Sequence, residues 1–421
     1  MSHNGNNGNQ PNVLLVFCDQ LRQHALGYAG GPVPTPNLDR LAQQGVRFSQ
    51  AYCTFPMCTP ARAALLTGRF CHALRDQQDR PYLYNNQLLD LDAPTFPKAL
   101  NSAGYKCSYI GKWHTDDAKY GRFIPRGPRR QGFDDEFYGL QCLSDITAPW
   151  HYNDDGTEQI KSERNWEPDH QTDLAEDYIR RAAERKKEEG TPFCLTVSYN
   201  PPHGPRDMPP EKEHLLTSAR EYVKDIRPNV PGKDQENPSE TAQQLQAKAY
   251  EEYIHYHANV MGIDECMGRL MSVLESCNLE EETLVIFTAD HGDYAGQFAR
   301  FCKGDPYEGA THVPMIMRDP RSPEQGRIMD QPVSNLDLFT TCLSAAGVEA
   351  PANTESRDLA PLLYGDPSEW DGRAFYKDGS QSSLVFGKYK LMRGERDGQV
   401  LYELYDLDES PPEATNRFND P

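Results

Sequence analysis

The chain has 421 residues, of which 37% are hydrophobic and 25% charged, which is typical of a globular protein with one large or several smaller domains. Its formal net charge of -20 at pH 7 argues against nonspecific binding to nucleic acid or to an anionic membrane surface. The 11 cysteines include no C-x-x-C pair, which excludes the usual zinc patterns and a compact disulfide framework.

The N-terminal segment carries no targeting signal that the sequence reveals. Residues 1–10 are polar and rich in Gly and Asn, without the charged and apolar regions of a signal peptide. No stretch approaches the apolar length of a membrane span. We therefore expect a cytoplasmic protein with reduced thiols, or a periplasmic or secreted one if a leader has been removed.

The first predicted element is a buried parallel strand. Residues 13–17 are continuously apolar, and the run ends at Asp19. A helix is expected over residues 35–44, where Pro lies in the first turn and Gly follows the last. Residues 46–52 predict a second strand, which leads to a turn and a helix at Cys58.

Helices and strands alternate along the rest of the chain. Further helices are expected over residues 95–103, 172–189, 243–277 and 335–346, and further strands over residues 105–110, 193–199, 283–288 and 313–317. Residues 211–242 are polar and contain several prolines, so they predict a surface excursion. Short alternating strands at residues 373–376, 383–392 and 401–405 predict a small antiparallel sheet.

Four of the predicted strands deliver a polar side chain at their C-terminal ends. These side chains are Asp19, Lys112, His203 and Asp290. Because such ends meet at one edge of a doubly wound sheet, we expect the four to lie together. The predicted fold class is α/β: a large doubly wound mixed sheet flanked by helices over residues 1–355, then a small C-terminal antiparallel-sheet subdomain over residues 356–421.

The run CTPAR at residues 58–62 has a physical meaning of its own. Pro60 suits the first turn of a helix, which places Cys58 at the helix N-terminus, where free N–H groups favour negative charge. Arg62, four residues on, can point to the same side. An anionic ester would meet a nucleophile and a guanidinium there; the plainer alternative is a buried Cys before a helix with a surface Arg.

Together with its flanking motifs, this run resembles the signature of the type I sulfatases, of the alkaline phosphatase superfamily. The matching motifs are PTPNLDRL (34–41), GVRF (45–48), LTGR (66–69), GKWH (111–114), DHG (290–292) and ELYDL (403–407). In that family the Cys, here Cys58, is oxidised by a maturation enzyme to formylglycine. One hydroxyl of the aldehyde hydrate attacks sulfur, and the other lets the sulfated group collapse and expel sulfate.

The resemblance also implies one divalent cation beside the formylglycine. The implied ligands are Asp19, Gln20, Cys58, Asp290 and His291. Oxygen ligands favour Ca²⁺, whereas an imidazole also admits Mn²⁺ or Zn²⁺, and Mg²⁺ stays an alternative. The commonest family pattern has Asp-Asp and Asp-Asn at these places, so this chain has one carboxylate fewer. Gln20 is either a ligand or a neighbour that orients one.

The remaining implied roles fall on cationic and histidine side chains. Arg62, Lys112 and Lys303 match residues that grip the sulfate and neutralise its charge. His114 matches the histidine that bonds one hydroxyl of the hydrate and acts as base, and His203 matches the one that protonates the leaving alcohol.

Several other polar residues receive weaker predictions. Asn200 and Asp293 are candidates for supporting contacts around the site. His312 is expected near the site, whereas His255 and His257 are given no role, because residues two apart on a helix do not share a face.

The sequence therefore predicts a metal-dependent sulfuric ester hydrolase that acts on a small-molecule or oligosaccharide sulfate ester, with a sulfated carbohydrate favoured. Its partners would be that ester and a formylglycine-generating enzyme, with no nucleic acid and no membrane. One alternative is a phosphonate monoester hydrolase or phosphodiesterase of the same superfamily. The other is a catalytically silent protein that binds a sulfated glycan.

Overall fold

Continuous apolar runs form the centre of the large sheet in this computed structural model, which describes residues 10–420 apart from residues 143, 227–241, 297–301, 324, 397 and 410–411. Every residue of β1 (Asn12–Asp19) is buried. β1 pairs in parallel with β8 (Phe193–Pro202) on one side and with β9 (Thr283–Ala289) on the other. A strand buried on both faces requires helices above and below it.

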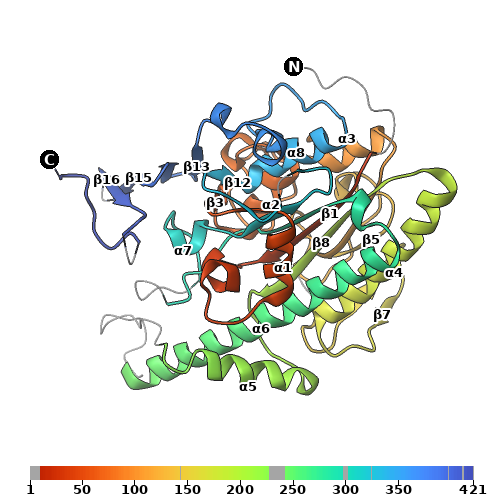
Figure 1. Ribbon diagram of the computed structural model, residues 1–421, viewed down its shortest axis with the longest axis horizontal. Coiled ribbons are helices and arrows are strands. Elements are labelled where there is room, and N and C mark those ends of the chain that lie inside the picture. The colour runs from red at the N-terminus through yellow and green to blue at the C-terminus, as the bar shows by residue number, and fades with distance from the viewer. Residues whose placement is uncertain are drawn as a thin grey trace.

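The sheet has eight strands in the order β11-β2-β10-β9-β1-β8-β4-β5. Its central strands β1 and β8 lie side by side (Figure 1). Its other members are β2 (Val46–Phe48), β4 (Lys106–Lys112), β5 (Phe137–Leu140), β10 (Met315–Arg318) and β11 (Arg327–Met329). β10 runs antiparallel to both of its neighbours, so the sheet is mixed. The predicted α/β fold class is confirmed.

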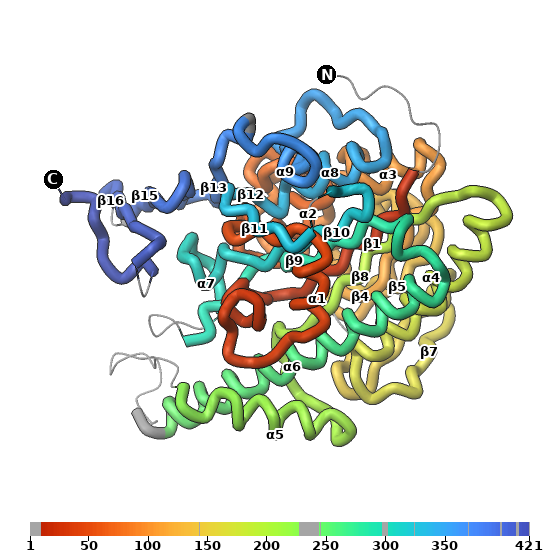
Figure 2. The backbone as a smooth tube through the Cα atoms, viewed as in Figure 1, coloured from red at the N-terminus to blue at the C-terminus, as the bar shows by residue number. Residues whose placement is uncertain are grey.

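Helices cover both faces of this sheet (Figure 2). One group packs around the long helix α6: α1 (Pro36–Gln44), α4 (Glu167–Glu189), α5 (Glu213–Tyr222) and α6 (Ala242–Ser276). The other group contains α2 (Cys58–Thr67), α3 (Phe96–Ser102), α8 (Leu338–Ala345) and α9 (Ala360–Tyr364). The short α7 (Glu308–Thr311) follows β9. No helix in the described part of the chain is long and apolar enough to cross a membrane.

Two predicted elements differ from the structure. The strand predicted over residues 46–52 is two strands, because β3 (Ala51–Tyr52) leaves the large sheet to pair with β12 (Val333–Ser334). The surface excursion predicted over residues 211–242 contains α5, whose Leu215 and Ala219 are buried. Residues 227–241 of that stretch lie outside the described residues.

The C-terminal sheet is antiparallel and projects from the body of the molecule (Figure 1). Its strands are β13 (Arg373–Lys377), β14 (Ser382–Phe386), β15 (Tyr389–Arg396) and β16 (Gln399–Asp406). Four strands stand where three were predicted, because Gly387, with φ 55°, turns the chain within residues 383–392. The separate two-stranded ribbon consists of β6 (Trp150–Tyr152) and β7 (Gln159–Lys161). The domain boundary at residue 355 stays a prediction.

Candidate active site

Cys58 is the first residue of α2, as the CTPAR run predicts. The backbone before it is extended, Pro60 lies in the first turn, and Gly68, with φ 64°, ends the helix. The Cys58 side chain is 2% exposed. The free N–H groups of the helix start therefore lie at a buried thiol, where they favour a negative charge.

Cys58 lies inside a buried cluster of acidic and imidazole side chains. One ligand atom from each of Asp19, Cys58, Asp290 and His291 lies within 4.8 Å of the others. The Cys58 Sγ is 3.4 Å from His291 Nε2 and 3.6 Å from Asp19 Oδ1. These residues come from the ends of β1 and β9 and from the start of α2, so the sheet edge gathers them as predicted.

The donor set of this cluster fits a divalent cation. His291 Nδ1 lies 3.0 Å from the Gly292 carbonyl oxygen, so Nδ1–H donates there and Nε2 is left facing the carboxylates. Burial and the nearby Asp19 charge raise the pKa of Asp290 to about 6. Burial opposes ionisation of Asp19 too, but Lys112 and Lys303 outweigh it and hold its pKa well below the usual range. A cation would relieve the repulsion between the two carboxylates.

Arg62 is buried against these carboxylates and does not extend into open space. Its Nε donates to Asp290 Oδ2 at 3.0 Å, and its Nη2 donates to Asp19 Oδ2 at 3.1 Å. Its Nη1 donates to the Lys112 carbonyl oxygen at 2.6 Å and to Ser198 Oγ at 2.7 Å. The guanidinium therefore orients the acidic residues, and its predicted contact with sulfate stays a prediction.

Lys112 and Lys303 approach Cys58 from two sides. Lys112 Nζ lies 2.7 Å from Asp19 Oδ2 and 4.0 Å from Cys58 Sγ. Lys303 Nζ lies 3.1 Å from Cys58 Sγ and donates to Gln20 Oε1 at 2.9 Å. Burial and Asp19 oppose the thiolate, but the two lysines and His291 hold the pKa of Cys58 well below its usual range. The site is built to receive negative charge.

The two predicted proton-transfer histidines have different surroundings. Neither ring nitrogen of His114 has a hydrogen-bond partner in the described part of the chain, and burial lowers its pKa. His203 Nδ1 lies 2.6 Å from the Gly204 carbonyl oxygen, to which it donates, so its Nε2 is the nitrogen left for chemistry. Burial, with Lys112 and Lys303 nearby, lowers the pKa of His203 to about 4 although Asp19 opposes this shift.

Strained backbone accompanies these side chains. Gln20 has φ 68°, His114 has φ 56° and Cys142 has φ 72°, all in the left-handed region that non-glycine residues rarely occupy. Cys142 lies just after β5 and is one of the groups that raise the pKa of Lys112. The surrounding fold therefore holds Gln20 and His114 in conformations that they would not adopt alone.

Some functional contacts escape the sequence analysis. Ser198 supports Arg62 from the middle of β8, and the Tyr256 hydroxyl donates to the Gln20 carbonyl oxygen at 3.0 Å. Asn200, a predicted supporting residue, accepts from Lys112 Nζ at 3.2 Å. Arg206 reaches Asp293, the other supporting candidate, with its Nη2 3.0 Å from Asp293 Oδ2. No motif marks Ser198, Arg206 or Tyr256.

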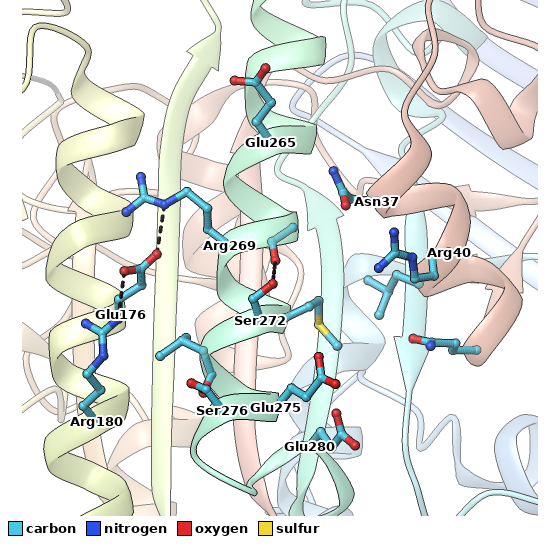
Figure 3. A pocket seen from close by; sticks show the side chains of 15 residues that line it. Asn37, Arg40, Glu176, Arg180, Glu265, Arg269, Ser272, Glu275, Ser276 and Glu280 are labelled. Atoms are coloured by element: carbon cyan, nitrogen blue, oxygen red, sulfur yellow. Dashed lines mark hydrogen bonds and ion pairs between the residues drawn. The ribbon is translucent and has the colours of Figure 1, made fainter.

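The remaining histidines lie outside the cluster. The His312 Nδ1 lies 2.9 Å from Glu308 Oε2, and its Nε2 lies 2.8 Å from the Ser49 carbonyl oxygen, so its expected place at the site is wrong. Figure 3 shows a groove between α1, α4 and α6, in which Arg269 pairs with Glu176. None of the predicted site residues lines that groove.

Comparisons with known proteins agree with this geometry. The family model described as Sulfatase matches residues 11–348, and the model described as N-sulphoglucosamine sulphohydrolase, C-terminal, matches residues 296–421. An ulvan-active sulfatase of Formosa agariphila is 31% identical over 373 residues, covering 87% of this chain and 67% of that protein. An N-acetylglucosamine-6-O-sulfatase of Bacteroides thetaiotaomicron is 26% identical over 473 residues, covering 97% of this chain and 83% of that protein.

A solved sulfatase structure has the same fold as this chain. The protein assigned as sulfatase yidJ from Bacteroides fragilis superimposes with a TM-score of 0.82 at 26% identity, covering 99% of this chain and 93% of the other. The family match spans more than half of the chain and includes the Cys58 turn and both halves of the acidic cluster. The chain therefore belongs to the sulfatase family of sulfuric ester hydrolases.

Proposed function

We propose that this protein hydrolyses a sulfate monoester of a carbohydrate, with a formylglycine made from Cys58 as the nucleophile and a divalent cation beside it. The observation that carries the proposal is the position of Cys58. Its Sγ lies 3.1 Å from Lys303 Nζ and 3.4 Å from His291 Nε2, between an ammonium group and the acidic cluster. The proposed reacting group therefore lies next to both a positive charge and the proposed metal ligands.

The proposed cation ligands are Asp19, Asp290, His291 and the amide oxygen of Gln20. A bound divalent cation supplies positive charge that stabilises a developing oxyanion and the sulfate oxygens. The predominance of oxygen ligands favours Ca²⁺, and the single imidazole also admits Mn²⁺ or Zn²⁺. Arg62 holds both carboxylates in place by donating to each of them.

Formylglycine at residue 58 requires a maturation enzyme as a partner. A hydrated formylglycine supplies two geminal hydroxyls, one to attack sulfur and one whose deprotonation re-forms the aldehyde and releases sulfate. The start of α2 holds this residue against Lys303 and the acidic cluster. His114 is the proposed acceptor of the proton that this release requires, because its ring nitrogens have no geometric hydrogen bond in the described part of the chain and Cys58 acts on its pKa.

Lys112 and Lys303 are the proposed sulfate-binding residues. Both ammonium groups lie near Cys58 Sγ, at 4.0 and 3.1 Å, and so flank the place where the transferring group must lie. A preorganised positive charge at that place stabilises the transition state. His203, with Nδ1 committed to the Gly204 carbonyl oxygen, presents Nε2 to protonate the leaving alcohol.

A carbohydrate is the favoured leaving group. One relative is named for activity on ulvan and another for N-acetylglucosamine 6-O-sulfate. Tyr120, which is 59% exposed, lies edge-on to His114 with ring centroids 5.6 Å apart. An exposed aromatic ring next to the reacting centre can pack against the apolar face of a sugar.

The first test is the mass of the tryptic peptide covering residues 48–62, from protein made in a host that matures a known sulfatase. The peptide contains Cys53 and Cys58, so Cys53 is an internal control. The proposal expects conversion of Cys58 alone. Two unmodified thiols would overturn the formylglycine mechanism and favour a silent glycan-binding role.

The second test compares substrates at matched leaving groups. Carbohydrate sulfates should be turned over faster than phosphate diesters and phosphonate monoesters. A preference for the phosphorus esters would replace the proposed activity with that of a phosphonate monoester hydrolase or phosphodiesterase.

A further inference from the structure

Arg206 makes three contacts in three directions from one guanidinium. Its Nε donates to the Pro202 carbonyl oxygen at 2.7 Å, and its Nη2 lies 3.0 Å from Asp293 Oδ2. Its Nη1 lies 2.8 Å from Glu252 Oε2, on α6. The Arg206 side chain is 16% exposed, and its guanidinium lies over the Tyr256 ring, 5.3 Å from the centroid.

The contact with Asp293 connects Arg206 to the proposed metal site. Asp293 Oδ2 accepts from Gln20 Nε2, and Asp293 Oδ1 accepts from the Ala295 N–H at 2.6 Å. A carboxylate can only accept hydrogen bonds, so it must face the amide nitrogen of Gln20. The Gln20 Oε1 then faces the cluster, where it accepts from Lys303 Nζ at 2.9 Å.

The contact with the Pro202 carbonyl oxygen connects Arg206 to the backbone of His203, the proposed proton donor. Pro202 ends β8, and His203 is the next residue. The His203 N–H donates to the Asp19 carbonyl oxygen at 3.2 Å on the sheet side of this turn. Arg206 binds the carbonyl that precedes the same N–H, so the peptide that orients His203 is fixed at both of its polar groups.

We propose that Arg206 is a positioning residue that couples the amide orientation of Gln20 at the cation site to the placement of His203. The inference rests on the proposed function for the role of His203 and on the acidic cluster for the role of Gln20. Arg206 itself touches neither Cys58 nor the acidic cluster; it acts through Asp293 and through the Pro202 carbonyl. The planar guanidinium reaches the three acceptors from three separate nitrogens in fixed directions, whereas the donors of a lysine all leave from one nitrogen.

The ion pair between Arg206 and Asp293 is largely buried, so its loss should affect the neighbouring side chains. The Asp293 side chain is 3% exposed and receives Arg206, Gln20 and the Ala295 N–H. Loss of the guanidinium would leave a buried carboxylate with less compensation, which is costly and favours rearrangement of its neighbours. One such neighbour is the Gln20 amide, which donates to the same carboxylate oxygen as Arg206.

The experiment compares Arg206→Met and Arg206→Lys with Glu252→Gln as the matched control. Glu252 contacts the same guanidinium but is 54% exposed and leads away from the site. The first readout is Ca²⁺ affinity, titrated by calorimetry into metal-free protein. We expect Arg206→Met to weaken it by about 10–100-fold. Glu252→Gln should change it by less than about twofold, since exposed pairs contribute little.

The second readout is kcat/KM over a series of sulfate esters with increasingly basic leaving alcohols. Esters with poor leaving groups depend most on protonation by His203. We expect the loss in Arg206→Met to be at least about tenfold larger for the poorest leaving group than for the best. A merely structural role would instead reduce all esters equally and leave Ca²⁺ affinity unchanged, and that result would overturn the proposal.

Asp293→Asn separates the two contacts if Arg206→Met does not fold. This variant keeps the shape of the side chain but no longer requires the Gln20 amide nitrogen to face it. We expect weaker Ca²⁺ binding and, because Arg206 keeps its bond to the Pro202 carbonyl oxygen, a smaller increase in the dependence on the leaving group than Arg206→Met shows. Unchanged Ca²⁺ binding would refute the coupling to Gln20. If the wild-type protein hydrolysed no sulfate ester, the proposed function would fail, while the calorimetric titration would still decide the contact through Asp293.

Discussion

The protein buries charged side chains around Cys58 and around Lys390, and the two clusters differ in how the charges are paired. Lys390, on β15, is 0% exposed, and its Nζ lies 2.9 Å from both Glu308 Oε1 and Glu413 Oε1. Glu413 Oε2 also accepts the Glu308 N–H at 2.8 Å. Each charge there has a protein partner, and the cluster ties the C-terminal sheet to α7.

The Cys58 cluster leaves some polar groups without protein partners. The ring nitrogens of His114 and the Nδ2 of Asn200 have none in the described part of the chain, and two lysines point toward one thiol. A buried polar network that is complete stabilises the fold, whereas an incomplete one is costly unless a ligand completes it. The comparison therefore separates a cluster for stability from a cluster for binding and chemistry.

The largest expected effect is that of Cys58→Ala, which removes the proposed nucleophile. We expect kcat/KM for an aryl sulfate to fall on the order of 10⁴-fold or more. Cys58→Ser should be equally inactive as a turnover catalyst, because an ester of serine has no aldehyde to re-form. Cys302→Ser, at an exposed cysteine, is the control and should keep full activity. Near-normal activity of Cys58→Ala would end the proposed mechanism.

Lys112→Met tests whether the site cluster serves chemistry more than stability. We expect kcat/KM to fall about 10²–10³-fold, because a preorganised charge beside the sulfate is lost. The urea midpoint of unfolding should change little, since Asp19 keeps Arg62 as a partner. A variant that unfolds easily but keeps normal kcat/KM would contradict the division between the two clusters.

Removal of the cation should make the electrostatic repulsion between Asp19 and Asp290 measurable. In metal-free protein the pKa of Asp290 is raised from 3.8 to about 6, so the folded state holds a proton that the unfolded state releases. Stability should then fall as the pH rises from about 4 to 6. Added Ca²⁺ should remove this loss by favouring the ionised carboxylate, as thermal unfolding at several pH values would show. Asp290→Asn should lack the loss even without Ca²⁺.

Lys390→Met should lower the stability of the fold, whereas Lys112→Met should lower kcat/KM. Removing the buried ammonium leaves Glu413 without its cationic partner and Glu308 with His312 alone, and we expect a loss of about 3–5 kcal/mol in the free energy of unfolding. Urea denaturation measures this loss. Lys388→Met is the control, because Lys388 is half-exposed and pairs with Asp406 at the surface. An unchanged urea midpoint for Lys390→Met would mean that this cluster does not stabilise the fold.

The smallest expected effect concerns a partly buried histidine pair between β6 and α4. His151 Nδ1 lies 3.0 Å from His170 Nε2, and burial together with the His151 charge lowers the pKa of His170 to about 4. The unfolded state therefore binds more protons between about pH 6.5 and 4, so stability falls as the pH drops through that range. His170→Gln should lessen the fall in a thermal pH series, whereas His214→Gln, at an exposed histidine, should not.

Much of the site was predictable from the sequence because it lies where strands end. Asp19, Lys112, His203 and Asp290 lie at or directly after the ends of predicted strands, and parallel strands bring such ends together. The fold class followed from the same predicted strands. The direction in which Arg62 points was not predictable, because it depends on Ser198 and on the Lys112 carbonyl, which no spacing connects to it.

Contacts made by irregular segments escaped prediction for the same reason. Arg206 lies in a proline-rich stretch without periodicity, and only the folded chain brings it to Asp293 and Glu252. The split between β2 and β3 also depends on a tertiary partner, since β3 pairs with β12 from residues 333–334. Local patterns identify elements, but partners distant in the sequence decide where those elements end.

The sequence distance between the halves of the acidic cluster has a consequence for synthesis on the ribosome. The Gln20 N–H and the Asp290 Oδ1 that accepts it are 270 residues apart. At about 5–20 residues per second, the ribosome needs roughly a quarter of a minute to a minute to add that stretch. Until β9 emerges and pairs with β1, Cys58 cannot reach its buried position. The nascent chain thus offers a thiol that the finished protein hides, and the proposed maturation of Cys58 would have its best access to the thiol within that interval.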